Sequence, residues 1–362
     1  MAEQYADDGQ YDQQYADQGY GDSGQQYEGK EAPPAQSSEG RDGAPAAALE
    51  LEHAIGYNGR VYDSLIYHPN GTDFVYPAGG CLVVCDFNDP HNQVFLRGHD
   101  EDLSVVVSSL SGRIVATGQQ GLNADVVVWQ YGEGNDKSAL YRLSEHDHGI
   151  AAMGFSQDER LLVTCGVDED GKLFVWDLAT GNIVATGKCP KGTKVAKFGG
   201  MVKNIKRRAT GDYQFITAGV QTLCYWTLTP QTGALTCTKI PSRVQRNYTC
   251  ASWSDDFEMC LVGSESGDFV FCVFPDKKNI SVGDSVNACA GGVHSILSTG
   301  SLIDDSIQVI VGGGDGTVTT FTRDRRGFID DASAKVEGKV LALSLSPDGA
   351  EVLAGTSSGF VY

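Results

Sequence analysis

One group of side chains in the sequence resembles the nucleophile, base and acid of a catalytic triad. His146, Thr164 and an aspartate of the next turn, Asp168 or Asp170, could let the imidazole take the threonine proton and activate the oxygen. Trp176 follows, and an indole N–H can only donate a hydrogen bond. A hydroxyl that accepts from an indole is typical of a buried structural hydrogen bond, so the chemistry predicted here is structural.

The same order of residue types occurs earlier in the chain, which favours the structural interpretation. The histidine and the tryptophan of each group are 30 residues apart, as in His99 and Trp129. A catalytic group is needed once, whereas a structural group repeats with the fold. We therefore predict that the protein is not an enzyme. The predicted structural hydrogen-bond network comprises His99, Thr117, Asp125, Trp129, His146, Thr164, Asp168 and Trp176.

Two further motifs could bind ligands but lack the required context. Gly312-Gly313-Gly314-Asp315-Gly316 is glycine-rich, yet no helix follows that could present amides to a phosphate. Asp168-Glu169-Asp170-Gly171 resembles the start of a calcium loop without its later ligands. Both are predicted to be turns between strands. We predict no cofactor, no metal and no small-molecule substrate.

The elements that carry these residues are predicted to be short strands. Between His146 and Asp177 the sequence alternates apolar runs of about five residues with turns rich in Asp and Gly, a pattern typical of an antiparallel meander. The predicted strands are Ile150–Phe155, Leu161–Gly166, Lys172–Asp177 and Asn182–Thr186.

This unit recurs along the chain. Positions equivalent to Trp176 are separated by 44, 47, 50, 46 and 49 residues, and the aligned residues are Cys85, Trp129, Trp176, Trp226, Cys272 and Phe321. This period, with Gly-His before Trp-Asp, is typical of a WD-type β-propeller. We predict an all-β fold with seven blades of four antiparallel strands over residues 49–362.

The last blade is predicted to combine both ends of this domain. Lys339–Leu345, Glu351–Gly355 and Phe360–Tyr362 would supply its three inner strands, and Leu49–Gly56 its outer strand. Closing the ring in this way would remove two exposed sheet edges.

Residues 1–48 are predicted to be a disordered acidic tail. The tail contains Tyr5, Tyr11, Tyr15, Tyr20 and Tyr27 among Gln, Asp, Gly and Ala, with ten acidic and two basic residues. Such a segment buries too little apolar surface to offset the entropy of ordering it. Its tyrosines could alternatively stack on a partner.

The composition also limits the classes of partner. A net charge of −20 argues against binding to nucleic acid or to an anionic membrane surface, and no apolar stretch is long enough to span a membrane. The ten cysteines contain no Cys-x-x-Cys pair, so we expect reduced thiols in a cytoplasmic protein.

Cations are concentrated in three loops. In a meander, the loops after the first and third strands emerge on one face, and this parity places nine cations of three consecutive blades together. They are Lys203, Lys206, Arg207, Arg208, Lys277, Lys278, Arg323, Arg325 and Arg326. They could be ordinary solvated loop residues, or a docking surface for an acidic protein.

Several stretches resemble the cilia- and flagella-associated protein 52 family. They include Ile55-Gly56-Tyr57-Asn58-Gly59, His68-Pro69, Val75-Tyr76-Pro77, Phe95-Leu96-Arg97-Gly98-His99, Ser111-Gly112-Arg113, Ala116-Thr117-Gly118-Gln119 and Ala124-Asp125-Val126-Val127-Val128-Trp129. The match is tight over about residues 50–180 and excludes the tail.

The resemblance implies a structural protein of the ciliary or flagellar axoneme, part of the cytoskeleton. Members of the family lie in the lumen of the B-tubule as microtubule inner proteins and bind tubulin and neighbouring inner proteins. They have two tandem propellers, so this chain would supply the first, either as a fragment or because the second is absent. The alternative function is a soluble cytosolic adaptor that recognises peptides on a propeller face.

Overall fold

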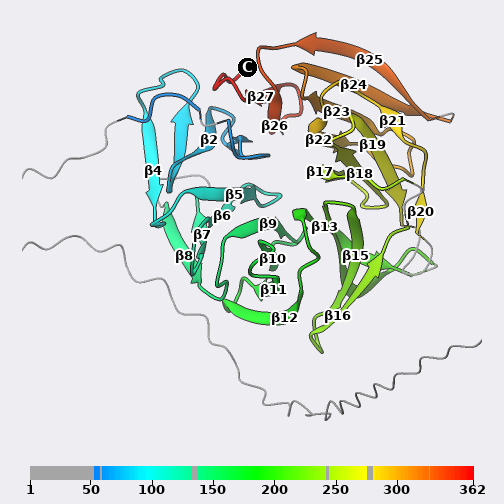
Figure 1. Ribbon diagram of the computed structural model, residues 1–362, viewed down its shortest axis with the longest axis horizontal. Coiled ribbons are helices and arrows are strands. Elements are labelled where there is room, and N and C mark those ends of the chain that lie inside the picture. The colour runs from blue at the N-terminus through cyan, green and yellow to red at the C-terminus, as the bar shows by residue number, and fades with distance from the viewer. Residues whose placement is uncertain are drawn as a thin grey trace, which may run out of the picture.

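The chain forms a ring of seven antiparallel sheets, the blades of a propeller, around a central channel (Figure 1). The computed structural model describes residues 53–57, 59–131, 137–204, 206–241, 244–274, 280–325 and 327–362, and no helix occurs among them. The predicted tail at 1–48 and the cations Lys277, Lys278 and Arg326 lie outside the described residues.

Blades 1 to 4 are four-stranded meanders in chain order. Their strands are β1 Ile66–Tyr67, β2 Asp73–Ala78, β3 Cys81–Asp86, β4 Gln93–Arg97, β5 Leu103–Ser108, β6 Ile114–Gln119, β7 Val126–Gln130, β8 Ser138–Leu143, β9 Ile150–Phe155, β10 Leu161–Gly166, β11 Lys172–Asp177, β12 Asn182–Lys188, β13 Thr193–Lys203, β14 Ala209–Gly219, β15 Thr222–Thr229 and β16 Ala234–Lys239.

Blades 5 and 6 follow the same order, and two short strands share the outer position of blade 5. Their strands are β17 Tyr248–Trp253, β18 Met259–Ser264, β19 Asp268–Val273, β20 Ser281–Val282, β21 Val286–Asn287, β22 Val293–Thr299, β23 Gln308–Gly313, β24 Thr317–Asp324 and β25 Gly327–Lys335. Blade 7 contains β26 Val340–Leu345 and β27 Val352–Thr356.

The predicted propeller is confirmed, down to the strand limits of blade 3. β9, β10 and β11 begin and end at the predicted residues, and β12 continues two residues further, to Lys188. The six residues aligned from Cys85 to Phe321 each lie on the third strand of a blade. Turn chemistry therefore located the strands correctly, because Asp and Gly favour the backbone conformations that end a strand.

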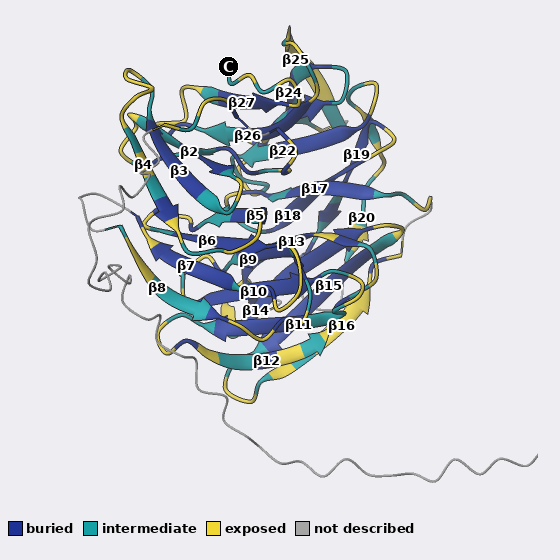
Figure 2. Cartoon of the chain, turned by 60° about the vertical axis from the view of Figure 1, so that its left-hand side comes forward, coloured by how far each residue is buried: buried dark blue, intermediate teal, exposed yellow. Residues whose placement is uncertain are grey.

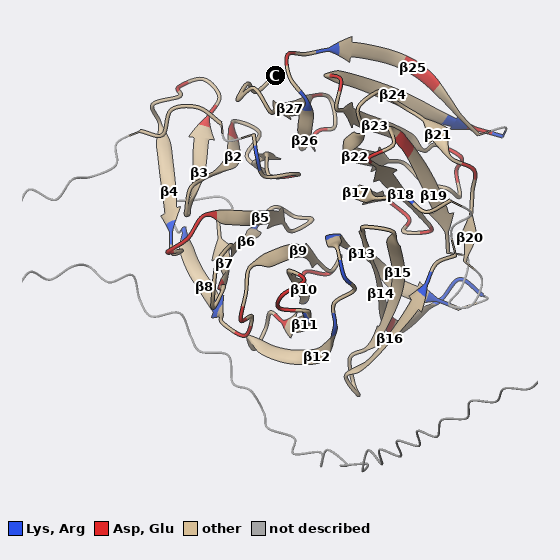
Figure 3. Cartoon of the chain, in the orientation of Figure 1, with Lys and Arg blue, Asp and Glu red and all other residues tan. Residues whose placement is uncertain are grey.

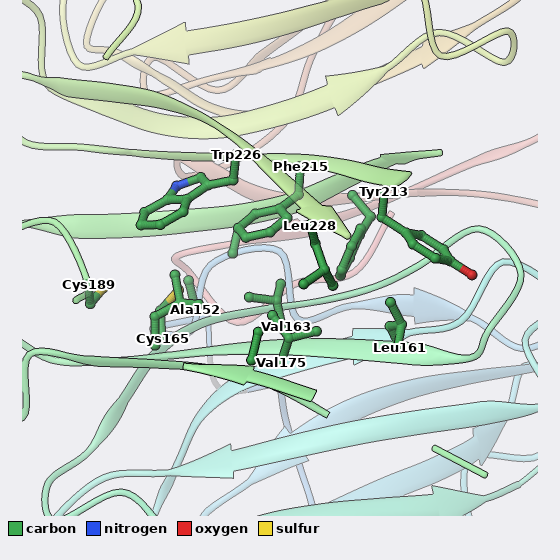
Figure 4. Close-up of a cluster of buried hydrophobic side chains, with 14 of the residues drawn as sticks. Ala152, Leu161, Val163, Cys165, Val175, Cys189, Tyr213, Phe215, Trp226 and Leu228 are labelled. Atoms are coloured by element: carbon green, nitrogen blue, oxygen red, sulfur yellow. The ribbon is translucent and has the colours of Figure 1, made fainter. Parts of the chain in front are cut away.

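Apolar side chains between neighbouring blades form the core. Figure 4 shows one such layer, in which Val163 and Val175 of blade 3 face Phe215 and Trp226 of blade 4. The Phe215 and Trp226 rings stack at 5.6 Å between centroids. Figure 2 shows that the inner strands are largely buried, whereas the rim strands β12 and β16 carry many exposed residues. Each blade is thus stabilised by burying both of its faces.

The ring closes where blade 1 packs against blade 7. Tyr57, Leu65 and Tyr76 share one buried cluster with Ala342 and Leu353. The backbone N–H of Tyr67 also donates to Ser344 Oγ at 2.9 Å. The contact therefore joins residues from opposite ends of the propeller sequence.

The predicted closing strand at Leu49–Gly56 is described only from His53, and His53–Gly56 form no strand. Ala54 instead donates its N–H to Gln93 Oε1 at 2.8 Å and accepts from Gln93 Nε2 at 3.0 Å, so these residues lie against blade 1. Phe360–Tyr362 do pair with β27, through two backbone hydrogen bonds of 2.9 Å between Ala354 and Tyr362.

A glycine on the second strand permits close approach of the next blade. A Cβ on Gly118 would lie 2.8 Å from Ile150, the first residue of the next inner strand. A Cβ on Gly355 would lie 2.9 Å from the Tyr57 ring. The contact that closes the ring is therefore like a contact within it, because in both a glycine without a side chain lets the next blade approach closely.

The segment before β1 reaches into the central channel (Figure 1, blue). The Asp63 carboxylate lies 2.8 Å from the Lys197 ammonium of β13, and the Asp63 N–H donates to Leu341 O of β26 at 3.0 Å. Burial by itself lowers the pKa of Lys197, but the Asp63 carboxylate outweighs it and the net pKa is raised. The segment thus ties blades 4 and 7 together across the channel.

Ring closure can be tested with one methyl group. We expect Gly355→Ala to lower the free energy of unfolding by about 1–3 kcal/mol, because the new Cβ would overlap Tyr57. Gly149→Ala is the matched control, since its Cβ would meet the nearest atom at an ordinary 3.4 Å. Urea denaturation of both variants checks this. Equal stability of the two would contradict the closing contact.

Candidate functional site: the hydrogen-bond chains and the cationic face

The structure brings His146, Thr164 and Trp176 into one chain of hydrogen bonds. Trp176 Nε1 donates to Thr164 Oγ1 at 3.0 Å, and Thr164 Oγ1 lies 2.8 Å from His146 Nε2. His146 Nδ1 lies 2.7 Å from Asp170 Oδ2. With the imidazole neutral, Nδ1 donates to the carboxylate and the threonine hydroxyl donates to Nε2.

Asp170, not Asp168, is the carboxylate of this chain, which corrects the predicted residue. Asp168 lies outside it, where Asp168 Oδ1 accepts from the N–H of Gly192 at 2.6 Å. Asp170 also accepts from the backbone N–H groups of Asp147 and Lys172, at 2.7 and 3.2 Å. The side chains of His146 and Asp170 are both fully buried.

In blade 2 the carboxylate is replaced by an amide. His99 Nε2 lies 2.6 Å from Thr117 Oγ1, which accepts from Trp129 Nε1 at 2.8 Å. His99 Nδ1 meets Gln119 Oε1 at 2.8 Å. Gln119 is not among the predicted residues, although it stands two residues after Thr117 on the same strand.

The predicted Asp125 is therefore not part of the blade 2 chain. Its carboxylate instead pairs with the guanidinium of Arg142. The N–H of Gln119 Nε2 donates to Asp100 Oδ1 at 2.7 Å, so Asp100 supplies the charge one step further out.

The two hydrogen-bond chains of blades 2 and 3 lack the geometry of a catalytic site. Thr117 and Thr164 are 0% exposed, so neither hydroxyl can reach a substrate, and each already accepts from an indole. Gly312 and Gly313 end β23, and residues 314–316 form the turn to β24. Within the described ranges no group of three or more His, Cys, Asp or Glu side chains could hold a metal. The chemistry of these residues is structural.

All ten cysteines are free thiols in the structure. Seven are buried, and only Cys237 is exposed. In the part of the chain that the structure describes, no helix is long and apolar enough to cross a membrane.

Carboxylates neutralise half of the described cations of the predicted docking surface. Lys203 Nζ lies 3.2 Å from Glu258 Oε1, and Arg207 Nη2 lies 3.7 Å from Glu258 Oε2. Arg323 pairs with Asp305. Lys203 and Arg207 belong to blade 4 and Glu258 to blade 5, so the two ion pairs of Glu258 stabilise the contact between these blades.

Three exposed cations have no carboxylate within ion-pair distance among the described residues: Lys206, Arg208 and Arg325. Figure 3 shows Lys and Arg interspersed with Asp and Glu around the ring. The described cationic surface is therefore smaller than predicted, and we define the cationic hairpin as residues 203–208 without residue 205.

The central channel contains two cavities, one toward each face, and the tie between Asp63 and Lys197 borders both. One cavity lies on the face that carries the turns between the second and third strands of each blade, the 2–3 turns. It has a volume of about 520 Å³, with Tyr62, Asp102 and Lys194 in its wall. The other cavity lies on the opposite face, which carries the cationic hairpin and the other turns between first and second strands, the 1–2 turns. It has a volume of about 730 Å³. Both are within the range of small binding pockets.

The threonine at the centre of the chain can be tested by comparing two blades. Thr217 Oγ1 accepts only from Trp226 Nε1, at 2.9 Å, whereas Thr164 serves both an indole and an imidazole. We expect Thr217→Val to cost about 1–3 kcal/mol, because one buried donor loses its acceptor. Thr164→Val should cost more. Urea denaturation measures both values, and a smaller loss for Thr164→Val would contradict this account.

Asp170 should contribute to acid sensitivity. Burial raises its pKa, but hydrogen bonds from His146 and from the backbone N–H groups of Asp147 and Lys172 outweigh burial and lower the pKa to about 2. Since an unfolded aspartate has a pKa of about 3.9, this stabilisation is present above about pH 4 and is lost as the pH falls toward 2.

Urea midpoints between pH 5 and 2 for the parent and for Asp170→Asn check this prediction. The advantage of the parent should shrink as the pH falls. If the difference in urea midpoint between the parent and Asp170→Asn stays constant over this range, the charge of the Asp170 carboxylate does not cause that difference.

Known proteins resemble this chain in sequence and in fold. Residues 137–177 match the family model of the WD domain, G-beta repeat. Cilia- and flagella-associated protein 52 of Chlamydomonas reinhardtii is 29% identical over 314 residues, which is 83% of this chain and 46% of that protein. The Homo sapiens protein of the same name is 29% identical over 325 residues, 88% of this chain and 50% of that protein.

Among solved structures, the WD40 repeats of RRP9 superpose with a TM-score of 0.61 at 14% identity, covering 82% of this chain and 87% of that one. A chain of the mitotic checkpoint complex gives 0.63 at 13% identity and covers 88% and 94%. The chain spans about half the length of the curated relatives named above. It is a WD-repeat β-propeller with curated homologues named cilia- and flagella-associated protein 52.

Proposed function

We propose that the chain is a non-enzymatic structural protein of the ciliary axoneme. The observation that carries this proposal is the similarity to cilia- and flagella-associated protein 52 of an alga and of a mammal, at 29% identity over 83% and 88% of this chain. A relationship that extends along the whole propeller supports a role for its surface, since propellers with different functions share only the fold.

The proposed location is the lumen of the B-tubule, with tubulin and neighbouring inner proteins as partners. A rigid ring suits this role, because its two faces and its rim can hold different partners at fixed positions. The exposed cations Lys206, Arg208 and Arg325 would contact acidic tubulin surface, where opposite charges orient binding. A tagged chain expressed in ciliated cells should remain with the doublets after a salt wash that removes soluble axonemal proteins.

A soluble adaptor is the second candidate, and the cavity of about 520 Å³ on the face of the 2–3 turns favours it. A peptide could enter there beside Tyr62, whose side chain is 51% exposed. An adaptor would be released into the salt wash, so the same extraction separates the two functions.

The cationic contribution can be tested by charge reversal. We expect Lys206→Glu with Arg208→Glu to weaken co-sedimentation with doublet microtubules about tenfold at low salt, and less at high salt where charge is screened. Lys188→Glu with Lys191→Glu is the matched control, because these exposed lysines lie at the end of β12 and in the loop to β13, on the opposite face. Equal effects of the two pairs would remove the hairpin from the interface.

A further inference from the structure

The cavity of about 730 Å³ opens as a funnel at the mouth of the channel, on the face of the 1–2 turns, and its wall combines serines, Asp63 and Lys197 with apolar side chains. We define this funnel by the lining residues Pro69, Leu110, Phe155, Phe257, Leu297 and Pro347. They come from different blades, so the funnel exists only in the assembled ring. Leu110 is 73% exposed at its lip.

The lip of the funnel is apolar on one side only. The 1–2 turns of blades 1, 2, 3, 5 and 7 share the same backbone hydrogen bond, which identifies equivalent positions. The second turn residue is Pro347, Pro69 and Leu110 in the consecutive blades 7, 1 and 2. It is Gln157 in blade 3 and Asp255 in blade 5.

The apolar arc is therefore not a requirement of the turn. Polar residues occupy the same position in other blades, and a solvent-exposed leucine adds nothing to the core. Turns of neighbouring blades touch, since a Cβ on Gly112 would lie 2.8 Å from Pro69. Exposed apolar residues on neighbouring turns favour contact with another apolar group.

The cationic hairpin lies on the same face as the funnel but does not line it, and one residue of the funnel wall leads to it. Phe257 lines the funnel, and the next residue, Glu258, holds Lys203 and Arg207 of the hairpin. Lys206 and Arg208 of the cationic hairpin are exposed. The nearby carboxylates of Asp158, Asp256 and Asp348 are used within their own turns, where each accepts from a backbone N–H.

We propose that the tyrosine-rich tail of this same chain, residues 1–30, occupies the funnel. This segment combines five tyrosines with seven acidic residues and one lysine. Tyrosine rings fit a funnel whose lip is apolar on one side and whose wall is partly polar, because the ring is apolar and the hydroxyl can remain solvated. The flanking carboxylates match Lys206 and Arg208.

Charge argues for a local contact rather than a general attraction. Residues 1–48 carry about −8 of the net −20, which leaves about −12 on the rest of the chain. The tail is therefore repelled by most of the propeller surface. Binding thus needs apolar contact together with exposed cations, and this face carries both, the first in the lip of the funnel and the second in the cationic hairpin.

The tail is long enough to reach. The 25 positions from 28 to 52 separate Tyr27 from the first described residue. A random coil of 25 residues has a root-mean-square span of about 28 Å, and a domain of this size has a radius of gyration of about 19 Å. Attachment to the same molecule gives an effective concentration in the millimolar range. Weak individual contacts with tyrosine are then sufficient for occupancy.

Photo-crosslinking in the full-length chain tests the proposal. The photoreactive residue p-benzoylphenylalanine is placed at Leu110, or at Leu122 as the control, which is 70% exposed in a 2–3 turn on the opposite face. Trypsin releases residues 1–30 as one peptide, because Lys30 is the first basic residue. We expect this peptide on the Leu110 probe at about tenfold the yield found on the Leu122 probe.

Two sets of variants identify the chemistry. Replacing all five tail tyrosines with serine should reduce the Leu110 crosslink about tenfold, and Lys206→Glu with Arg208→Glu should reduce it several-fold. Thermal melts verify that each variant keeps the parent fold. Equal yields at Leu110 and Leu122, or yields unchanged by the tyrosine substitutions, would overturn the proposal.

A mixture of isotopically labelled and unlabelled chains separates the tail of the same molecule from that of a second copy. Crosslinks within one chain support the proposal, whereas a majority joining labelled to unlabelled chains would overturn it in favour of self-association. The experiment needs no microtubules. Its failure is therefore distinguishable from failure of the proposed axonemal function.

Discussion

Every blade of this protein is apolar on both faces, and this constraint determines the ring. Val175 and Phe215 are 0% exposed because sheets from two blades cover them. A row of such sheets would leave one apolar face bare at each end, and the cost of exposing it is avoided only when the last sheet meets the first. The contacts of Tyr57 with Gly355 and of Tyr67 with Ser344 therefore matter as much as any contact inside the ring.

The threonine of the second strand and the tryptophan of the third strand are either both retained or both replaced in blades 2 to 6. Thr117, Thr164 and Thr217 each accept from the tryptophan of the third strand. In blades 5 and 6 the strand registers place Val262 and Val311 at the threonine position, and Cys272 and Phe321 stand in place of the tryptophan. Loss of both polar partners leaves no buried donor unpaired, so the degenerate blades lose little stability.

The sequence predicted the fold well because the strand signal is local. The limits of β9, β10 and β11 follow from turns with Ser, Asp, Thr or Gly within a few residues of each strand. The hydrogen-bond chains were predicted less completely, since the partner of the histidine stands two residues after the threonine in blade 2 and six after it in blade 3. The pairing of Lys203 with Glu258 could not be predicted, because it joins residues 55 apart across a blade boundary.

The two faces of the ring differ because the tie between Asp63 and Lys197 lies between the two cavities of the channel. Apart from the residues near this tie, the two cavities have different linings, so a partner on each face meets a different surface. The cationic hairpin lies on the face of the funnel, and the proposed contacts with microtubules and with the tail both use Lys206 and Arg208. An acidic microtubule surface and the acidic tail would therefore compete, and binding of one requires release of the other. Tail occupancy would then weaken association with microtubules by the fraction of molecules in which the funnel is filled.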